Sequence, residues 1–466
     1  MAKLSEKIGY GMGDMSSSMF WKIFSYYLPI FYSDIFGLTL AQTATLMFVT
    51  RCWDGISDPL MGVIADRTQT RWGKYRPYLL WFAAPFAIAG ILLFTTPEVG
   101  NQVDYQGRLI YAYITYILMM TVYTCINVPY ASMLGVVTSD TQEKTVFSSY
   151  RMFFAYGGSF IALFAWEPLC DFFTKYQPLS KVESNADAWQ GAMIVIATVC
   201  FLLFISSFLL TREHVKVKQN ASLGNDFKYL LRNLPWWIIT GGALCTNLFH
   251  TVRGATVAYY FKYYIGENAH INLGVAEFLF FAGLFLAVGE VCNMVGVVSA
   301  VPLSKRLGKK STFILSAIAM AIFSILFFYV PMNNAGFILM LLFQILISLF
   351  TGIVSPLVWS MYADVADYST ATNGTSSTAL IFSSGSMAQK FGGAIAGAAV
   401  LMLFDAFGLV PNAATQTDTA LLGMQLTMSY IPAAVALIMA AAISLYPLTT
   451  KRMLHINQEL SADAHS

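Results

Sequence analysis

Three ionisable residues lie close together in an otherwise apolar stretch of the chain, "LMFVTRCWDGISDPLMGVIADR". Arg51, Asp54 and Asp58 are spaced three and four residues apart, so on a helix they would share one face. Because an ionised group at the bilayer centre costs about 2.5–3.5 kcal/mol, this face should point toward other helices or toward water. One interpretation is purely structural: Arg51 pairs with Asp54, and Asp58 caps a break at Pro59.

The other interpretation is a site that couples to a cation. Two carboxylates one helical turn apart repel each other in a partly dry environment. They can relieve this repulsion by sharing a proton or by capturing a metal cation. A site whose charge is balanced only when a cation is bound is what coupled transport requires. We therefore predict a cation-binding site at Asp54 and Asp58, which holds no metal other than a transported sodium ion.

Other charged residues also lie within apolar stretches. Arg151 is near the start of its stretch, so it fits snorkelling to the interface as well as a functional role. Lys390 lies deep in a segment rich in Gly, Ala and Ser, which favours close helix packing. Positive groups outnumber negative ones at this depth, which favours a substrate with a carboxylate. The groups compared are Lys22, Arg51, Arg151, Arg253 and Lys390 against Asp54, Asp58 and Glu290.

The composition places these residues in a polytopic membrane protein. Of the 466 residues, 57% are hydrophobic and 11% are charged. Soluble domains carry about 25% charged residues. Apolar stretches long enough to span a bilayer recur near 15–36, 40–65, 78–96, 108–136, 147–166, 188–210, 236–265, 273–302, 311–331, 336–361, 378–407 and 421–447.

The Lys and Arg residues between these stretches are distributed unequally. If the N-terminus is cytoplasmic, most of them fall in cytoplasmic loops, and the opposite side receives Arg108, Lys175 and Lys181. The positive-inside rule therefore predicts that both termini are cytoplasmic. We expect a multi-pass protein of the plasma (cell inner) membrane. The predicted parts are an N-terminal six-helix bundle over 1–210, a cytoplasmic central loop over 211–235, a C-terminal six-helix bundle over 236–450 and a cytoplasmic tail over 451–466.

The two predicted bundles share a motif. A short basic turn with a Gly-Lys pair follows the second stretch of each, in "DRTQTRWGKYRPYLL" from Asp66 and in "SKRLGKKSTFILSA" from Ser304. Two parallel six-helix repeats of this kind are typical of the major-facilitator fold. The predicted fold class is an all-α polytopic membrane protein with twelve transmembrane helices.

Several longer motifs are similar to those of a known transporter family. "IGYGMGDMSSSMF", "RCWDGISDPLMGVIADRTQTRWGKYRPYLLW", "NVPYASMLGVVTSD", "YADVADYSTATNGTSS" and "AQKFGGA" closely resemble the glycoside–pentoside–hexuronide:cation symporters. The resemblance runs from about residue 5 to about residue 450, and it is most specific over 51–77. It implies secondary active symport of a glycoside, pentoside or hexuronide with H⁺ or Na⁺ by alternating access.

The resemblance also implies roles for individual residues. The family's cation site falls on Asp54, Asp58 and Thr124, with Ser57 where melibiose permease, a member, has an asparagine. Positions expected to bind substrate are Ser18, Asn127, Arg151 and Lys390, which match family positions, together with Lys22 and Trp359, a charged and an aromatic residue expected at membrane depth. Ser18 and Asn127 stand where that permease has sugar-binding aspartates, so its galactoside recognition is not expected here. The expected cytoplasmic gate comprises Asp66, Arg67, Arg71 and Lys74, with Asp364 and Asp367 as its counterpart in the second half.

The expected partners are a small sugar, such as a uronide or an oligosaccharide, and membrane lipid. We expect no nucleic-acid partner, no cofactor besides the co-transported cation, and a functional monomer. An enzyme is not expected, because HExxH, GxSxG and paired His ligands do not occur in the sequence. The alternative is a major-facilitator transporter of lipids, lysolipids or another non-sugar solute, which would need an apolar cavity.

Overall fold

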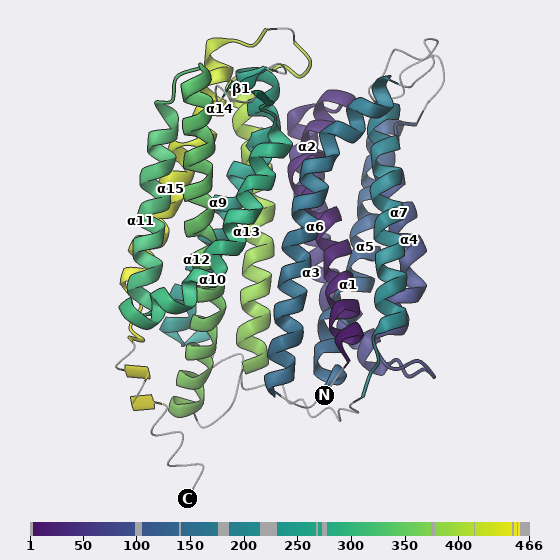
Figure 1. The fold of residues 1–466 in the computed structure, drawn as a ribbon, viewed down its shortest axis with the longest axis vertical. Helices are drawn as coiled ribbons and strands as arrows, with labels where there is room; N and C mark the ends of the chain where they lie inside the picture. Colours follow the sequence, from purple (N-terminus) through teal and green to yellow (C-terminus); the bar gives the residue numbers. More distant parts are fainter. Residues whose placement is uncertain are drawn as a thin grey trace, which may run out of the picture. The chain divides into compact units, whose positions relative to one another are not determined.

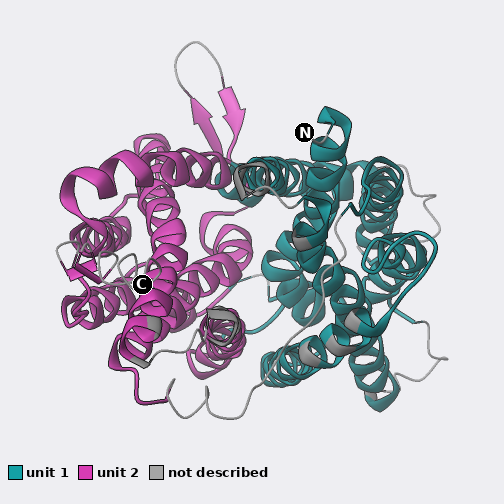
Figure 2. Ribbon diagram, turned by 90° about the horizontal axis from the view of Figure 1, so that it is seen from below, with its two compact units in different colours: residues 1–219, 282–287, 409–415 teal, residues 220–281, 288–408, 416–466 magenta. Residues whose placement is uncertain are grey.

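The computed structural model consists of two compact, mainly helical units (Figure 1). It describes residues 3–97, 105–138, 141–175, 186–214, 231–266, 269–272, 277–373, 378–413, 415–449, 452–453 and 455–456. Figure 2 colours unit 1 teal and unit 2 magenta. Unit 1 comprises residues 1–219 with the short segments 282–287 and 409–415, and unit 2 comprises the remainder.

Unit 1 is built around helix α1 (Leu4–Tyr26), which packs against α6 and α7. Helix α4 contacts α5 and α7, and α3 contacts α5. The contact between α3 and α5 matters most for the candidate site, because α3 carries Asp54 and Asp58. The other elements are α2 (Leu28–Ile30), the π-helix η1 (Phe31–Ile35), α3 (Leu40–Arg67), α4 (Pro77–Leu93), α5 (Tyr105–Val137), α6 (Thr141–Lys175) and α7 (Ala186–Leu210).

Unit 2 is built around helix α9 (Leu234–Tyr259), which contacts α12, α13 and α15. In both units a π-helical segment follows the first long helix, directly after α9 in unit 2 and after the short α2 in unit 1. The other elements are η3 (Tyr260–Ile265), β1 (His270–Asn272), β2 (Glu277–Leu279), α10 (Ala282–Leu307), α11 (Lys309–Phe328), α12 (Asn334–Asn373), α13 (Thr378–Ala406), α14 (Asp418–Met428) and α15 (Tyr430–Ser444).

The helices account for all twelve predicted spans. Among the described residues, eight helical segments are long and apolar enough to cross a membrane, with α14 and α15 counted as one, and α4 is a shorter apolar helix. Helices α1, α3 and α9 occupy the remaining predicted positions. Together with the family membership reported below, this confirms the all-α, major-facilitator fold class.

Several predicted boundaries were wrong. The eighth span was expected from residue 273, but His270–Asn272 and Glu277–Leu279 form an antiparallel hairpin, and α10 begins at Ala282. Strand β2 contains apolar residues such as Phe278, so it could not be distinguished by hydropathy from the apolar helix that follows, and the predicted span included it. Helix α1 begins eleven residues before the predicted 15, at Leu4, and α12 continues to Asn373, because a helix can extend beyond its apolar part.

The start of α3 is set by local hydrogen bonds. The Gln42 N–H donates to the Thr39 hydroxyl oxygen at 3.3 Å, and the Thr39 N–H donates to the Gln42 side-chain oxygen at 3.1 Å. This reciprocal capping box ends the preceding turn, in which Gly37 has a φ of +85°. A single uninterrupted helix then carries positions 51, 54 and 58 on one face.

Two glycines allow α10 and α12 to touch at the backbone in unit 2. A Cβ on Gly352 would lie 2.2 Å from the Asn293 carbonyl oxygen, and a Cβ on Gly296 would lie 2.2 Å from that of Leu349. Without a favourable hydrophobic effect between helices in lipid, such close packing of small residues is a main source of helix association.

This crossing yields a stability prediction. Gly352→Ala should lower the free energy of unfolding by about 1–3 kcal/mol, because the backbone oxygen it meets cannot move aside cheaply. Thermal unfolding in detergent measures the effect. The matched control is Gly397→Ala in α13, where a Cβ would meet nothing within 4 Å. Equal melting temperatures for the two variants would contradict the assigned packing.

Candidate functional site

The acidic pair of α3 meets α5 at a single hydroxyl group. The Thr124 hydroxyl lies 3.1 Å from Oδ1 of Asp54 and 3.2 Å from Oδ1 of Asp58, at donor distance from both carboxylates. It lies 3.1 Å from the Ser57 hydroxyl, which also donates to the Asp54 backbone carbonyl at 3.1 Å. The four residues named together from the sequence therefore converge in space.

This arrangement places charge in a poorly solvated environment. Asp54 is 1% exposed, Thr124 is 2% exposed and Ser57 is 7% exposed, whereas Asp58 is half-buried. The Thr124 hydroxyl has one hydrogen, so it can donate to only one carboxylate at a time. Chemically, the two carboxylates and two hydroxyls offer a set of oxygen atoms that suits a proton or a hard cation.

Aromatic residues adjoin the acidic pair within unit 1. The Arg51 guanidinium lies 4.1 Å from the centre of the Trp21 ring, a cation–π contact between α3 and α1. The Trp21 ring in turn lies 5.3 Å from the Tyr123 ring of α5. Asn127, expected to bind substrate, donates from Nδ2 to the Tyr123 carbonyl oxygen at 3.1 Å. These contacts connect the predicted cation-site and substrate residues of α1, α3 and α5.

The predicted substrate residue Arg151 is engaged in an ion pair. Its Nε donates to Oδ2 of Asp14 in α1 at 2.9 Å, and its guanidinium lies 5.4 Å from the Tyr130 ring centre. Sequence reasoning missed Asp14. Its spacing of four and eight residues from Ser18 and Lys22 places all three on one face of α1, and this was the available signal.

The remaining α1 positions are accessible in part. Ser18 and Lys22 are both half-buried. The Lys22 ammonium lies 3.4 Å from the Tyr26 hydroxyl and 5.4 Å from the centre of that ring. The α1 face thus carries one acidic, one hydroxyl and one basic group in consecutive turns, which can bind a polar solute through several hydrogen bonds.

Two predicted substrate residues belong to unit 2. Trp359 in α12 is half-buried, with its ring 5.9 Å from that of Tyr362. Lys390 in α13 is also half-buried. Their participation in one site with residues of unit 1 stays a prediction.

The predicted gate residues of unit 1 lie at the end of α3 and in the basic turn that follows it, which together span residues 66–77. Asp66 belongs to α3, but its side chain lies outside the described part of the chain. Arg67 is exposed at the end of α3. The Arg71 guanidinium lies 4.5 Å from the Trp72 ring centre, and the Lys74 ammonium lies 4.9 Å from the Tyr75 ring centre. The turn therefore presents cations held against aromatic rings.

The predicted counterpart in unit 2 has a partner within its own unit. Lys309 donates from Nζ to both carboxylate oxygens of Asp364, at 2.6 and 2.8 Å. Lys309 is the lysine of the second Gly-Lys pair, so this bond ties the turn before α11 to α12. Asp367, one turn further along α12, is exposed. Pairing of these aspartates with the basic turn of unit 1 stays a prediction.

Comparisons with known proteins cover nearly the whole chain. Residues 9–450 match the family described as "MFS/sugar transport protein". The chain is 33% identical to "Putative glycoside/cation symporter YagG" of Escherichia coli (strain K12), covering 98% of this chain and 95% of that protein. It is 31% identical to "Isoprimeverose transporter" of Lactiplantibacillus pentosus, covering 93% and 86%.

A solved structure supports the fold. The crystal structure of "D-xylose-proton symporter" superposes with a TM-score of 0.66 at 14% identity, covering 96% of this chain and 98% of the other. With the family match over residues 9–450 and the identity to curated relatives, the resemblance seen in the motifs is confirmed. The chain therefore belongs to the MFS/sugar transport protein family, and within it to the glycoside–pentoside–hexuronide:cation symporters.

Proposed function

We propose that this protein is a proton-coupled symporter of a glycoside that works by alternating access, with Asp54, Asp58 and Thr124 as its coupling site. The observation that carries the proposal is the convergence of two carboxylates on one Thr124 hydroxyl inside unit 1. Relatives named as a glycoside/cation symporter and an isoprimeverose transporter support the substrate class. We place the protein in the inner membrane as a monomer with both termini cytoplasmic, as the loop charges favour.

The coupling follows from electrostatics. With both carboxylates ionised, two neighbouring negative charges share the hydrogen of the Thr124 hydroxyl, and their mutual repulsion in a buried place disfavours this state. Uptake of a proton removes one charge and supplies a second hydrogen for the same oxygen atoms. If sugar binds more tightly to the protonated form, the proton must also bind more tightly when sugar is present, because such linkage is reciprocal.

We propose the proton over sodium because of Ser57. Where melibiose permease has an asparagine, this chain has a shorter hydroxyl side chain, which bonds to the Asp54 carbonyl and contacts the Thr124 hydroxyl. A neutral amide oxygen that could serve as a metal ligand is therefore replaced by a group already engaged in the local hydrogen-bond network. Two carboxylates with adjacent hydroxyls still provide the acceptor oxygens and the hydrogen-bond donors between which a proton can be shared.

For the substrate, we propose a neutral glycoside. The Asp14–Arg151 ion pair balances the arginine that a substrate carboxylate would otherwise neutralise. The count that favoured a uronide omitted Asp14; with it, five cationic residues at membrane depth stand against four anionic ones, and Arg151 already has a carboxylate partner.

A first prediction concerns the coupling carboxylates. Asp58→Asn should abolish accumulation of methyl β-D-xyloside above the external concentration, because the variant has one carboxylate and no repulsion for a proton to relieve. Downhill counterflow should survive. Uptake by energised vesicles measures the effect, with Asp171→Asn, an exposed carboxylate of α6, as the matched control. Concentrative uptake by Asp58→Asn would refute the assigned site.

A second prediction concerns the ion. Uptake should follow an imposed proton gradient and be indifferent to a sodium gradient, whereas Ser57→Asn should gain a sodium response, because it restores an amide ligand. A matrix of uptake rates against external pH and sodium concentration provides the measurement. Sodium-driven accumulation by the wild-type protein would overturn the choice of proton.

A third prediction concerns the substrate's charge. Wild-type protein should favour methyl β-D-xyloside over methyl β-D-glucuronide. Asp14→Asn should shift this ratio toward the glucuronide by about tenfold, which corresponds to 1.4 kcal/mol for an unbalanced arginine. Competition uptake of the two labelled sugars measures the ratio, and Asp171→Asn should leave it unchanged. A wild-type preference for the glucuronide would contradict the proposal.

A further inference from the structure

One carboxylate outside the coupling site receives three consecutive backbone N–H groups. Glu213 follows α7 in a segment without regular secondary structure, residues 211–214, which we term the strap. Its Oε1 accepts from the N–H groups of Tyr75 and Arg76, each at 2.7 Å, and its Oε2 accepts from that of Lys74 at 2.8 Å. The acceptors and donors are 137 to 139 positions apart in the sequence.

The basic turn is shaped to present these groups. Thr70 and Gly73 are bridged, with the Thr70 hydroxyl donating to the Gly73 carbonyl at 2.8 Å, and Gly73 has a φ of +119°. A Cβ at Gly73 would lie 2.5–2.8 Å from the three carboxylate atoms of Glu213. The N–H groups of residues 74–76 immediately precede α4, where a carboxylate is favoured by both the orphan donors and the helix dipole.

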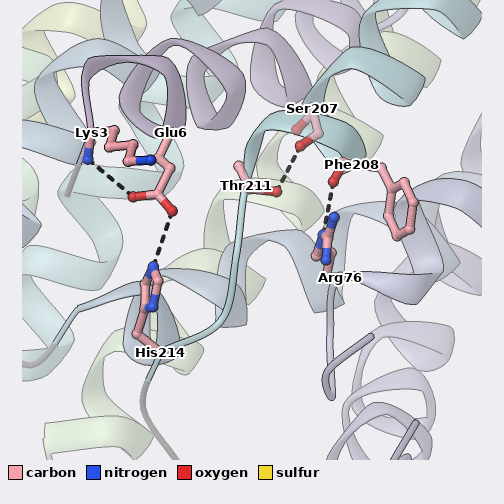
Figure 3. Close-up of polar contacts among 7 residues, drawn as sticks. All are labelled: Lys3, Glu6, Arg76, Ser207, Phe208, Thr211 and His214. Atoms are coloured by element: carbon pink, nitrogen blue, oxygen red, sulfur yellow. Dashed lines mark hydrogen bonds and ion pairs between the residues drawn. The ribbon is translucent and has the colours of Figure 1, made fainter. Parts of the chain in front are cut away.

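Further contacts hold the strap in place. The Arg76 Nε donates to the Phe208 carbonyl at 2.8 Å, and its guanidinium lies 4.3 Å from that ring centre (Figure 3). The Thr211 hydroxyl donates to the Ser207 carbonyl at 2.6 Å, and His214 Nε2 lies 3.0 Å from Glu6 Oε1. The backbone N–H of His214 donates to the Val136 carbonyl at 2.8 Å. The strap thus joins α1, α5 and α7 to the start of α4.

The charges around the strap are predominantly basic. Burial and the neighbouring Arg212 both lower the pKa of Arg76, while Glu213 opposes this shift. Glu213 therefore balances positive charge that the turn gathers at Lys74 and Arg76, in addition to accepting hydrogen bonds. Replacing it with a neutral group removes both contributions.

We propose that Glu213 is a positioning residue for the gate. Its carboxylate holds residues 74–76 in one conformation, and this orients Arg71 and Lys74 for the step that opens and closes the cytoplasmic side. The inference rests on the proposed function, because alternating access requires a cytoplasmic gate and the family resemblance predicts that the basic turn is part of it. Glu213 touches neither the coupling carboxylates nor the predicted substrate residues among its hydrogen bonds, so it should affect the rate of the cycle more than sugar affinity.

Amide hydrogen exchange tests the contact without any transport. In wild-type protein the amides of Lys74, Tyr75 and Arg76 should be protected. Glu213→Gln should accelerate exchange by about tenfold or more at one or more of them, because an amide cannot accept three N–H groups as a charged carboxylate does. Glu213→Ala should expose all three. Asp171→Asn, which neutralises an exposed carboxylate of α6, is the control and should leave the three amides protected.

Transport kinetics test the gating role. For Glu213→Gln we expect Vmax for methyl β-D-xyloside to fall about tenfold while KM stays within about twofold, with partial recovery in Glu213→Asp, which restores the charge. Gly73→Ala should behave like Glu213→Gln, because its methyl group displaces the carboxylate. Gly266→Ala is the matched control, since Gly266 also has a positive φ, of +91°, but open space around its Cβ position.

The exchange experiment and the transport experiment each have an outcome that would contradict the proposal. Unchanged amide protection in Glu213→Ala would show that the strap does not hold the turn. Faster exchange with an unchanged Vmax would show that the contact is structural and has no part in the cycle. If wild-type protein took up neither methyl β-D-xyloside nor methyl β-D-glucuronide, the proposed substrate class would fail, while the exchange result would still decide whether Glu213 fixes residues 74–76.

Discussion

The structure depends on an electrostatic constraint: two carboxylates one helical turn apart converge on a single buried hydroxyl. Asp54 is almost fully enclosed, and its Oδ1 and that of Asp58 both contact the Thr124 hydroxyl. A buried charge is tolerated only when other groups compensate it. In the proposed cycle a proton adds to this compensation when it binds and takes its share away when it leaves, so the repulsion between the two carboxylates makes the site sensitive to its occupant.

The rest of unit 1 supplies the conditions for this sensitivity. The capping box at Thr39 starts α3 so that the two aspartates share the face turned to α5. Aromatic rings of Trp21 and Tyr123 connect that face to α1, where Asp14 engages Arg151. We therefore propose that the proton and the sugar bind to neighbouring side chains on these helices. At the far end of α3, the strap and its Glu213 carboxylate give the basic turn a defined shape.

The sequence alone predicted local features well. The spacing of Asp54 and Asp58, the twelve apolar segments and the paired Gly-Lys turns all reflect helix periodicity or hydropathy, which are properties of neighbouring residues. Thr124 was reached only through the family resemblance. Asp14 and Glu213 were not found, because their partners lie 137 or more positions away in the sequence. For Asp14 the only local signal was its place on one helix face with Ser18 and Lys22, and Glu213 has no local signal that distinguishes it from an ordinary helix-end carboxylate. The hairpin over 270–279 was missed for a related reason: its strands are too short to show an alternating pattern.

The most direct test of the central claim is the proton exchange that accompanies sugar binding to purified protein. In a weakly buffered solution with a pH indicator, adding methyl β-D-xyloside should draw protons from solution, and sugar affinity should fall as the pH rises. The Asp58→Asn variant should show neither effect. Sugar binding with no proton uptake and with constant affinity from acidic to alkaline pH would contradict the account.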